Sequence, residues 1–184
     1  MDIETLLTEK KKAVIRKWTD QVLESYSSPE FFKKQKDRFA NPIGATISDG
    51  LAKLYTVLVE KKDLDEALKP LEDIIKIRAV QEFTPSQAVL FLYQFKNIVH
   101  QELPGAKNRD DISVSLDALA ARIDKAALMA FDIYMNCRER LHQIRINEVL
   151  SGRSALTDGT KCISAMLKKN RTELADNNQN NRLT

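Results

Sequence analysis

Side chains suited to catalysis or metal binding are sparse in this sequence of 184 residues, which has two histidines and two cysteines. His100 lies one turn before a Leu-Pro break and His142 lies among arginines, so neither has a second ligand close by in the chain. A metal site or an acid–base pair needs such a group. Exposed helix histidines are therefore favoured over a ligand or a proton switch. Cys137 and Cys162 lack a CxxC spacing, which favours reduced thiols over a disulfide or a metal site.

Sequence motifs of the common enzyme classes are absent from the chain. It contains no glycine-rich phosphate loop of the GxGxxG or GxxxxGK[ST] type, no HExxH zinc motif and no GxSxG nucleophile turn. No pair of carboxylates stands out from the charged background. We therefore predict a protein that is not an enzyme and that uses no cofactor and no metal. An enzyme with an unrecognised carboxylate site is the least favoured alternative.

Charges of both signs are interleaved along the chain. Lysine and arginine number 29 and aspartate and glutamate 26, which leaves a net charge of +3. The two basic runs, at 10–12 and 168–171, contain no aromatic residue of the kind that stacks on bases, so solvated helix faces are favoured over a nucleic-acid surface. The sequence has neither an apolar signal segment nor an apolar run long enough to span a membrane. We expect a cytoplasmic protein with no nucleic-acid or membrane partner.

The elements that position these residues are predicted to be helices. Five glycines and five prolines are too few for the frequent turns of a β-sandwich or barrel. Apolar residues recur every three or four positions, which predicts helices over about 3–27, 29–39, 43–62, 70–82 and 85–103, with a helical turn at 63–68. Thr84, Pro85 and Gln87 form a capping box that fixes one helix start. Gly44 and Gly50 are expected to mark close helix crossings.

A last and much longer helix is predicted over about 112–150, where glycine and proline are absent. Its apolar side chains alternate in spacings of three and four, as in a heptad repeat. We predict that this stripe forms the interface of a homodimer, although a stripe of this kind also suits packing onto the chain's own core. The candidate interface residues are Ala130, Tyr134, Cys137, Leu141 and Ile144.

The C-terminal residues divide the chain into two predicted parts, a helical sensor-like domain over 1–150 and an extension over 151–184. Ser151, Gly152 and Arg153 interrupt the repeat and are expected to end the long helix. A weaker amphipathic pattern predicts a short extra helix at about 155–174, and the asparagine-rich residues 177–184 are expected to be disordered. The predicted architecture is an all-α helical bundle with a long C-terminal helix and a short extra helix.

The stretch 73–88, which reads DIIKIRAVQEFTPSQA, resembles the N-terminal domain of the RsbT co-antagonist (RsbRD) family. Phe91 and Lys96 extend the resemblance, as do Trp18, 41–43 and 50–51, so that it covers about 10–150. The resemblance implies a globin-like helical fold without haem, a homodimer, and a long final helix that passes a signal onward. In that family the output is often a STAS domain or a histidine kinase. Too few residues follow 150 for either, so a separate signalling partner or a free-standing input module is expected.

Against a globin-like order of helices, the helix at 70–82 holds the usual haem-ligating position, and it contains no histidine. His100 falls on the next helix, which disfavours haem. The leading hypothesis is thus a regulatory sensor domain of a bacterial stress- or redox-type signalling system, which binds a ligand or partner and rearranges its helices. The alternative is a small-molecule or cofactor carrier with an interhelical pocket. Such a pocket would be lined by aromatic residues that are otherwise expected in the core, namely Trp18, Phe91, Tyr93, Phe95, Phe131 and Tyr134.

Overall fold

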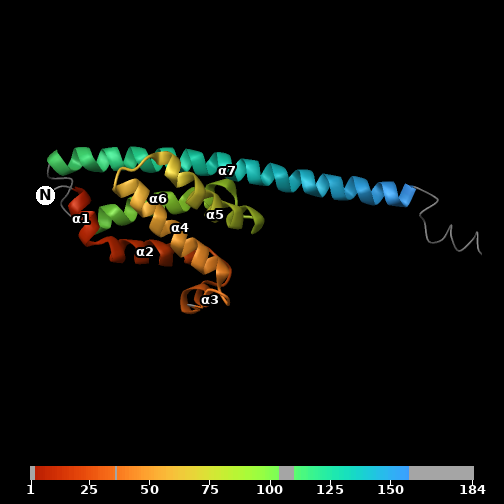
Figure 1. The fold of residues 1–184 in the computed structure, drawn as a ribbon, viewed down its shortest axis with the longest axis horizontal. Coiled ribbons are helices and arrows are strands. Elements are labelled where there is room, and N and C mark those ends of the chain that lie inside the picture. The colour runs from red at the N-terminus through yellow and green to blue at the C-terminus, as the bar shows by residue number, and fades with distance from the viewer. Residues whose placement is uncertain (1–2, 36, 104–109, 158–184) are drawn as a thin grey trace, which may run out of the picture. The chain divides into compact units, whose positions relative to one another are not determined.

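The computed structural model describes residues 3–35, 37–103 and 110–157, and every regular element in these ranges is a helix (Figure 1). The all-α fold class is therefore confirmed. In chain order the elements are α1 (Ile3–Glu9), α2 (Lys11–Glu24), α3 (Pro29–Lys34), α4 (Pro42–Val59), the 3-10 helix η1 (Leu64–Ala67), α5 (Leu68–Val80), α6 (Pro85–Glu102) and α7 (Asp110–Thr157). None of the described helices is both long enough and apolar enough to cross a membrane.

The chain divides into two compact units, Met1–Arg138 and Glu139–Thr184. In the first, called the N-terminal unit below, α4 packs against α2 and α5, and α2 packs against α6. The described part of the second unit is the remainder of α7, up to Thr157. The division at 150 that the sequence suggests stays a prediction, and the predicted helix at 155–174 and tail at 177–184 lie largely outside the described residues.

The core of the N-terminal unit is built around Trp18 of α2. Its ring stacks on Phe95 of α6, with ring centroids 4.4 Å apart, and its indole Nε1 donates a hydrogen bond of 2.7 Å to the carbonyl of Phe91. Phe91, Phe95 and Tyr134 are buried with it, so these aromatic residues belong to the core. Tyr93 and Phe131 are exposed instead. The aromatic set therefore does not converge on one pocket.

Local signals set most helix boundaries as predicted. The capping box is present, because the Thr84 hydroxyl accepts a hydrogen bond from the Gln87 backbone and the Gln87 side chain accepts one from the Thr84 backbone. Asn41 caps α4 by accepting a 2.8 Å hydrogen bond from the backbone of Gly44. Gly50 does lie at a helix crossing, since a Cβ there would meet Ile74 of α5 at 3.0 Å. Gly44 does not, because a Cβ there would meet the side chain of Asn41.

Three predicted boundaries are wrong. The helix expected over 29–39 ends at Lys34. The single helix expected over 3–27 is divided at Lys10, whose backbone leaves the helical region and whose Nζ donates to the carbonyl of Glu102 at 2.5 Å. The end expected at 151–153 does not occur, because α7 continues to Thr157. A glycine inside a helix costs about 1 kcal/mol relative to alanine. With no proline and no capping residue beside Gly152, that cost does not end the helix.

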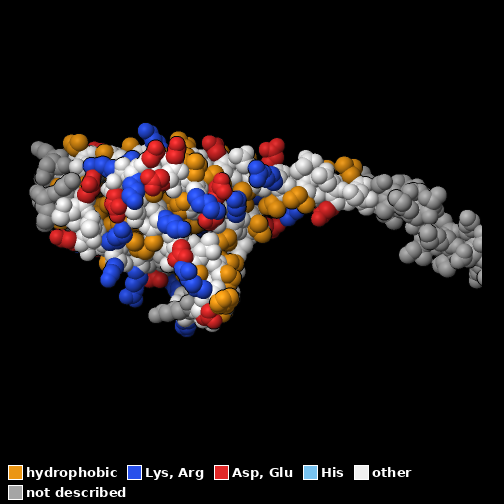
Figure 2. Space-filling view, in the orientation of Figure 1, with side chains coloured by type: hydrophobic (Ala, Val, Ile, Leu, Met, Phe, Trp, Pro, Cys, Tyr) orange, Lys and Arg blue, Asp and Glu red, His pale blue; other side chains and the backbone are white. Residues whose placement is uncertain are grey.

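Charged side chains of both signs alternate over the face of the N-terminal unit seen in Figure 2. In the predicted basic run at 10–12, Lys10 pairs with Glu102 and Lys11 pairs with Glu60 at 3.2 Å. Lys10 and Lys11 thus form ion pairs within the chain, as expected for charged residues on solvated helix faces. The second run, 168–171, lies outside the described residues.

Candidate functional site

The predicted interface residues fall into two groups. Ala130 and Tyr134 are buried in the core of the N-terminal unit, whereas Cys137 and Leu141 are half-buried and Ile144 is 53% exposed. The heptad stripe therefore packs inward over its first half, which is the alternative that the sequence left open. The prediction of a dimer interface now concerns the residues that follow Tyr134.

The histidines lie apart from any cluster of potential ligands. His100 on α6 and His142 on α7 are both exposed. Over the described ranges no group of three or more histidine, cysteine, aspartate or glutamate side chains is placed to hold a metal ion. Cys137 is a free thiol, while Cys162 lies outside those ranges.

The unusual feature of the N-terminal unit is a buried arginine. Arg78, near the end of α5, is 1% exposed, and its guanidinium carbon lies 5.2 Å, 4.8 Å and 5.4 Å from the ring centroids of Tyr26, Phe83 and Phe91. Rings at such distances attract a cation through their negatively charged faces. We call Arg78 and these three rings the Arg78 cluster.

Polar partners satisfy only part of the guanidinium. Arg78 Nη1 donates to the carbonyl of Gln87 at 2.8 Å, and Nη2 donates to the Ser25 hydroxyl at 3.0 Å. Arg78 Nε and the Tyr26 hydroxyl are buried, and neither has a hydrogen-bond partner of good geometry. Burial lowers the pKa of Arg78 and raises the pKa of Tyr26. The charge interaction and the side-chain contact between these two residues partly oppose both pKa shifts.

The Arg78 cluster is joined to α7 by two hydrogen bonds. The Tyr134 hydroxyl donates to the carbonyl of Phe83, and Arg138 Nη1 donates to the carbonyl of Ala79 at 3.1 Å. Both acceptors lie in the segment 78–83, which ends α5 and leads to α6. Two hydrogen bonds therefore connect this segment directly to α7.

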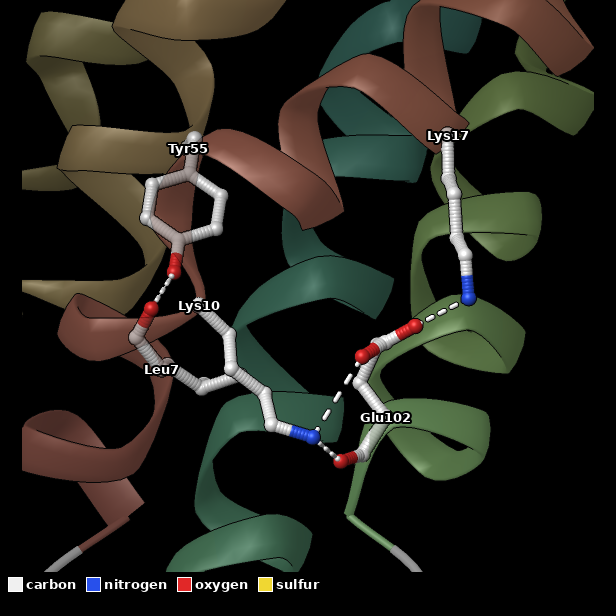
Figure 3. A network of polar contacts seen from close by, with 5 residues as sticks. All are labelled: Leu7, Lys10, Lys17, Tyr55 and Glu102. Atoms are coloured by element: carbon white, nitrogen blue, oxygen red, sulfur yellow. Dashed lines mark hydrogen bonds and ion pairs between the residues drawn. The ribbon is translucent and has the colours of Figure 1, made fainter.

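A second polar network lies near the other end of α6 (Figure 3). Lys10 and Lys17 both approach the carboxylate of Glu102, and the Tyr55 hydroxyl donates to the carbonyl of Leu7 at 2.6 Å. The two lysines hold the pKa of the Glu102 carboxyl below its ordinary value, with the contact from Lys17 as the main cause. Each group of this network has a protein partner, so it fastens α1 and α2 to the rest of the unit.

Sequence reasoning did not select Arg78 as a site residue. The signal was present, because Leu71, Ile74, Ile75 and Arg78 follow the three-and-four spacing of one helix face. A charged residue on an otherwise apolar face is rarely buried without a reason. Arg78, Phe83 and Gln87 also lie in the stretch 73–88 that carried the family resemblance.

Comparisons with known proteins agree with that resemblance. No solved structure matches the chain significantly, so the globin-like arrangement stays a prediction. A protein of Archaeoglobus fulgidus, described as an uncharacterized protein, is 24% identical over 139 residues, which cover 75% of this chain and 83% of that protein. The family described as the RsbT co-antagonist protein rsbRD N-terminal domain matches residues 12–149. Since this match covers most of the sequence, the chain belongs to the family of rsbRD N-terminal domains.

Proposed function

We propose that this chain is a regulatory sensor domain that binds a ligand or partner at the Arg78 cluster and responds by shifting α7. The family is one of regulatory stress-signalling domains and is not a known family of enzymes. The observation that carries the proposal is the pair of hydrogen bonds from Tyr134 and Arg138 to the segment 78–83. Helix packings change between discrete arrangements, so a change at this segment has a defined route into α7.

The exposed apolar residues in the last part of α7 support the further proposal of an interface there. Ile144, Ile146, Val149 and Leu150 are each more than half exposed. Apolar side chains gathered on one exposed helix often mark a contact with another protein. A homodimer and a separate signalling partner are both proposed occupants, and the homodimer is the simpler one because it needs no second gene product.

The carrier alternative receives less support. The hollow of about 640 Å³ beside Tyr26 and Phe83 is open to solvent and would not enclose a cargo. The hollow between α1, α4 and α7, lined by Leu7, Leu58 and Leu119 among others, has a volume of about 20 Å³. A hollow of this size holds about one water molecule. Native mass spectrometry of the freshly purified protein separates the alternatives, since a carrier retains its cargo in stoichiometric amount and an unoccupied sensor does not.

Phe83 provides the test of coupling to α7. Phe83→Leu removes the ring beside Arg78 but keeps the carbonyl that accepts from Tyr134. We expect faster amide exchange in residues 126–138 of α7, and a smaller effect of the same change in a Tyr134→Phe background. Exchange rates give the free energy of local opening in α7. In this free energy, the effects of Phe83→Leu and Tyr134→Phe should depart from additivity by more than about 0.5 kcal/mol, the usual limit for independent sites.

Phe31→Leu is the matched control, because Phe31 lies on α3 and is 50% exposed. It should leave exchange in α7 unchanged. Equal effects of Phe83→Leu in the two backgrounds would refute the proposed route from the Arg78 cluster to α7.

A further inference from the structure

Arg78 carries a buried charge without a negative partner. Among the described residues no carboxylate lies within ion-pair distance of its guanidinium, whose hydrogen bonds go to a carbonyl and a hydroxyl. Burial of an ion costs several kcal/mol even after the protein relaxes. Neutral hydrogen bonds and aromatic faces offset part of this cost. The Arg78 cluster is therefore a place where negative charge is favoured.

Two unsatisfied hydrogen-bond donors lie in this place. Arg78 Nε and the Tyr26 hydroxyl are buried without a partner of good geometry, although buried polar atoms nearly always have one. The two side chains interact with one another, but this contact leaves both atoms incompletely satisfied. The guanidinium carbon is 5.2 Å from the Tyr26 ring, so both donors share one neighbourhood. A group with two oxygen acceptors, such as a carboxylate or a phosphate, is suited to bind both.

An open hollow adjoins the two donors. Its volume is about 640 Å³, and its wall comprises Ser25, Tyr26, Ser27, Val80, Gln81, Glu82, Phe83 and Gln87. Ser25, Tyr26 and Phe83 thus line the hollow, and each of them also contacts Arg78. Arg78 is buried and is not itself part of the wall, so a ligand reaches its guanidinium only if a side chain of the wall moves. Glu82, the acidic residue in this wall, opposes the entry of an anion.

We propose that this hollow binds a small ligand through an oxyanion, a carboxylate or a phosphate, that accepts hydrogen bonds from Arg78 Nε and the Tyr26 hydroxyl. The inference rests on the proposed function in taking the Arg78 cluster as the sensing site. Entry of the oxyanion requires the Phe83 ring to move aside. Since the Phe83 carbonyl is bonded to Tyr134, this movement reaches α7.

The experiment observes the Arg78 Nε–H signal by proton–nitrogen NMR while sodium phosphate or sodium acetate is added to the full chain. Sodium chloride at equal ionic strength and neutral acetamide are the control solutes. We expect the chemical shift of this signal to change in a saturable way with phosphate, with acetate or with both. The anion that binds more tightly identifies the kind of oxyanion. No saturable movement with either anion, or the same movement with chloride, would overturn the proposal.

Three variants make the test specific. Tyr26→Phe should weaken binding by up to about tenfold, the value of one hydrogen bond, and Arg78→Met should abolish the saturable response of the neighbouring amide signals. Glu82→Gln should tighten binding several-fold, because it removes a like charge from the wall. Tyr26→Phe and Glu82→Gln keep the test decisive if Arg78→Met does not fold. Unchanged affinity in both would overturn the site.

The same titration separates this inference from the proposed function. Anion binding that leaves amide exchange in α7 unchanged would support the ligand site and contradict the sensor mechanism. Coupling of Phe83 to Tyr134 without any anion binding would support the mechanism and contradict the ligand class.

Discussion

Tyr134 of α7 donates its hydroxyl hydrogen bond to the carbonyl of Phe83, the residue whose ring lies 4.8 Å from the guanidinium carbon of Arg78. One residue thus contacts the buried charge with its side chain and α7 with its backbone. Arg138 adds a second bond, to the carbonyl of Ala79. Two hydrogen bonds therefore connect α7 to the segment 78–83.

Removal of the Tyr134 hydroxyl is predicted to loosen this connection. Tyr134→Phe leaves the Phe83 carbonyl without its donor, and we expect a loss of about 1 kcal/mol in the free energy of unfolding. Amide exchange should rise in α7 and at 81–84. Tyr93→Phe serves as the control, because Tyr93 is 42% exposed. An equal loss in both variants would contradict a specific role for the Tyr134 hydroxyl.

Arg122 is predicted to be important for stability. Its guanidinium donates to the carbonyls of Leu58, Val57 and Lys62 at 3.3, 2.9 and 2.6 Å, where α4 ends. Carbonyls at a helix C-terminus lack internal partners and favour a cation. Arg122→Met keeps most of the side chain and removes the donors, so we expect a loss of about 2 kcal/mol in denaturant titrations.

Lys125→Met is the control for Arg122→Met, because Lys125 is exposed on the same helix. It removes one positive charge without removing a cap. A loss in Lys125→Met as large as in Arg122→Met would show that net charge, and not the capping of α4, is responsible.

Two glycines are predicted to respond oppositely to alanine. A Cβ at Gly44 would lie 2.7 Å from Asn41 Oδ1, in a buried network that caps α4 and binds the carbonyls of Phe32 and Gln35. Gly44→Ala should cost about 1–3 kcal/mol, as other overpacked sites do. Gly152 has nothing within 4 Å of such a Cβ. Gly152→Ala should raise helix content in circular dichroism without lowering the melting temperature.

The ionisation of Tyr55 gives a prediction at high pH. Burial, with a smaller effect of Glu60, raises the pKa of Tyr55 to about 12 in the folded protein. In the unfolded chain a tyrosine has a pKa of about 10. The folded state therefore holds this proton more tightly, so the stabilisation is complete below about pH 10 and is lost as the pH rises toward 12.

Ultraviolet titration of tyrosinate checks this ionisation. Tyr55→Phe should remove the component that titrates last and should flatten the alkaline decline in stability. If Tyr55→Phe leaves both curves unchanged, the hydroxyl that donates to Leu7 is not held as the structure indicates.

The sequence predicted those parts of the fold that depend on local interactions. The box at Thr84 was readable because cap, proline and returning glutamine occur within four successive residues. The break at Lys10 was not, because Lys10 bonds to Glu102, which is 92 positions away. Contacts at such separation leave no periodic signal in a single sequence.

The burial of Arg78 could be inferred from the apolar helix face that it shares, but the rings that surround it could not be predicted, for the same reason. The members of the Arg78 cluster come from the connection after α2, from α5, from the connector between α5 and α6, and from α6, and only the stretch 78–91 is continuous. The apolar stripe of α7 could be identified in the sequence, but a heptad pattern indicates only that one face of the helix is buried. Whether the covering surface is the chain itself or a second copy depends on the tertiary fold, which buries Ala130 and Tyr134 inside the N-terminal unit.

The last prediction concerns a homodimer through the final part of α7. Tyr134 is taken up by its bond to Phe83, so an interface formed by the predicted heptad stripe must use later residues of that stripe, of which Leu141 is half-buried and Ile144 is 53% exposed. A charge placed in a desolvated apolar contact costs several kcal/mol. We therefore expect the double variant Leu141→Glu, Ile144→Glu to shift the protein toward monomer in size-exclusion chromatography with light scattering, while its helicity is kept.

The matched control is Leu128→Glu with Met135→Glu, which places the same two charges on exposed positions of the same helix, where Leu128 is 68% and Met135 is 47% exposed. If the control dissociates the dimer and the test variant does not, the interface lies on the outer face of the N-terminal unit. If the wild-type protein is a monomer at micromolar concentration, the homodimer is ruled out under those conditions, and the apolar end of α7 is left for a different protein.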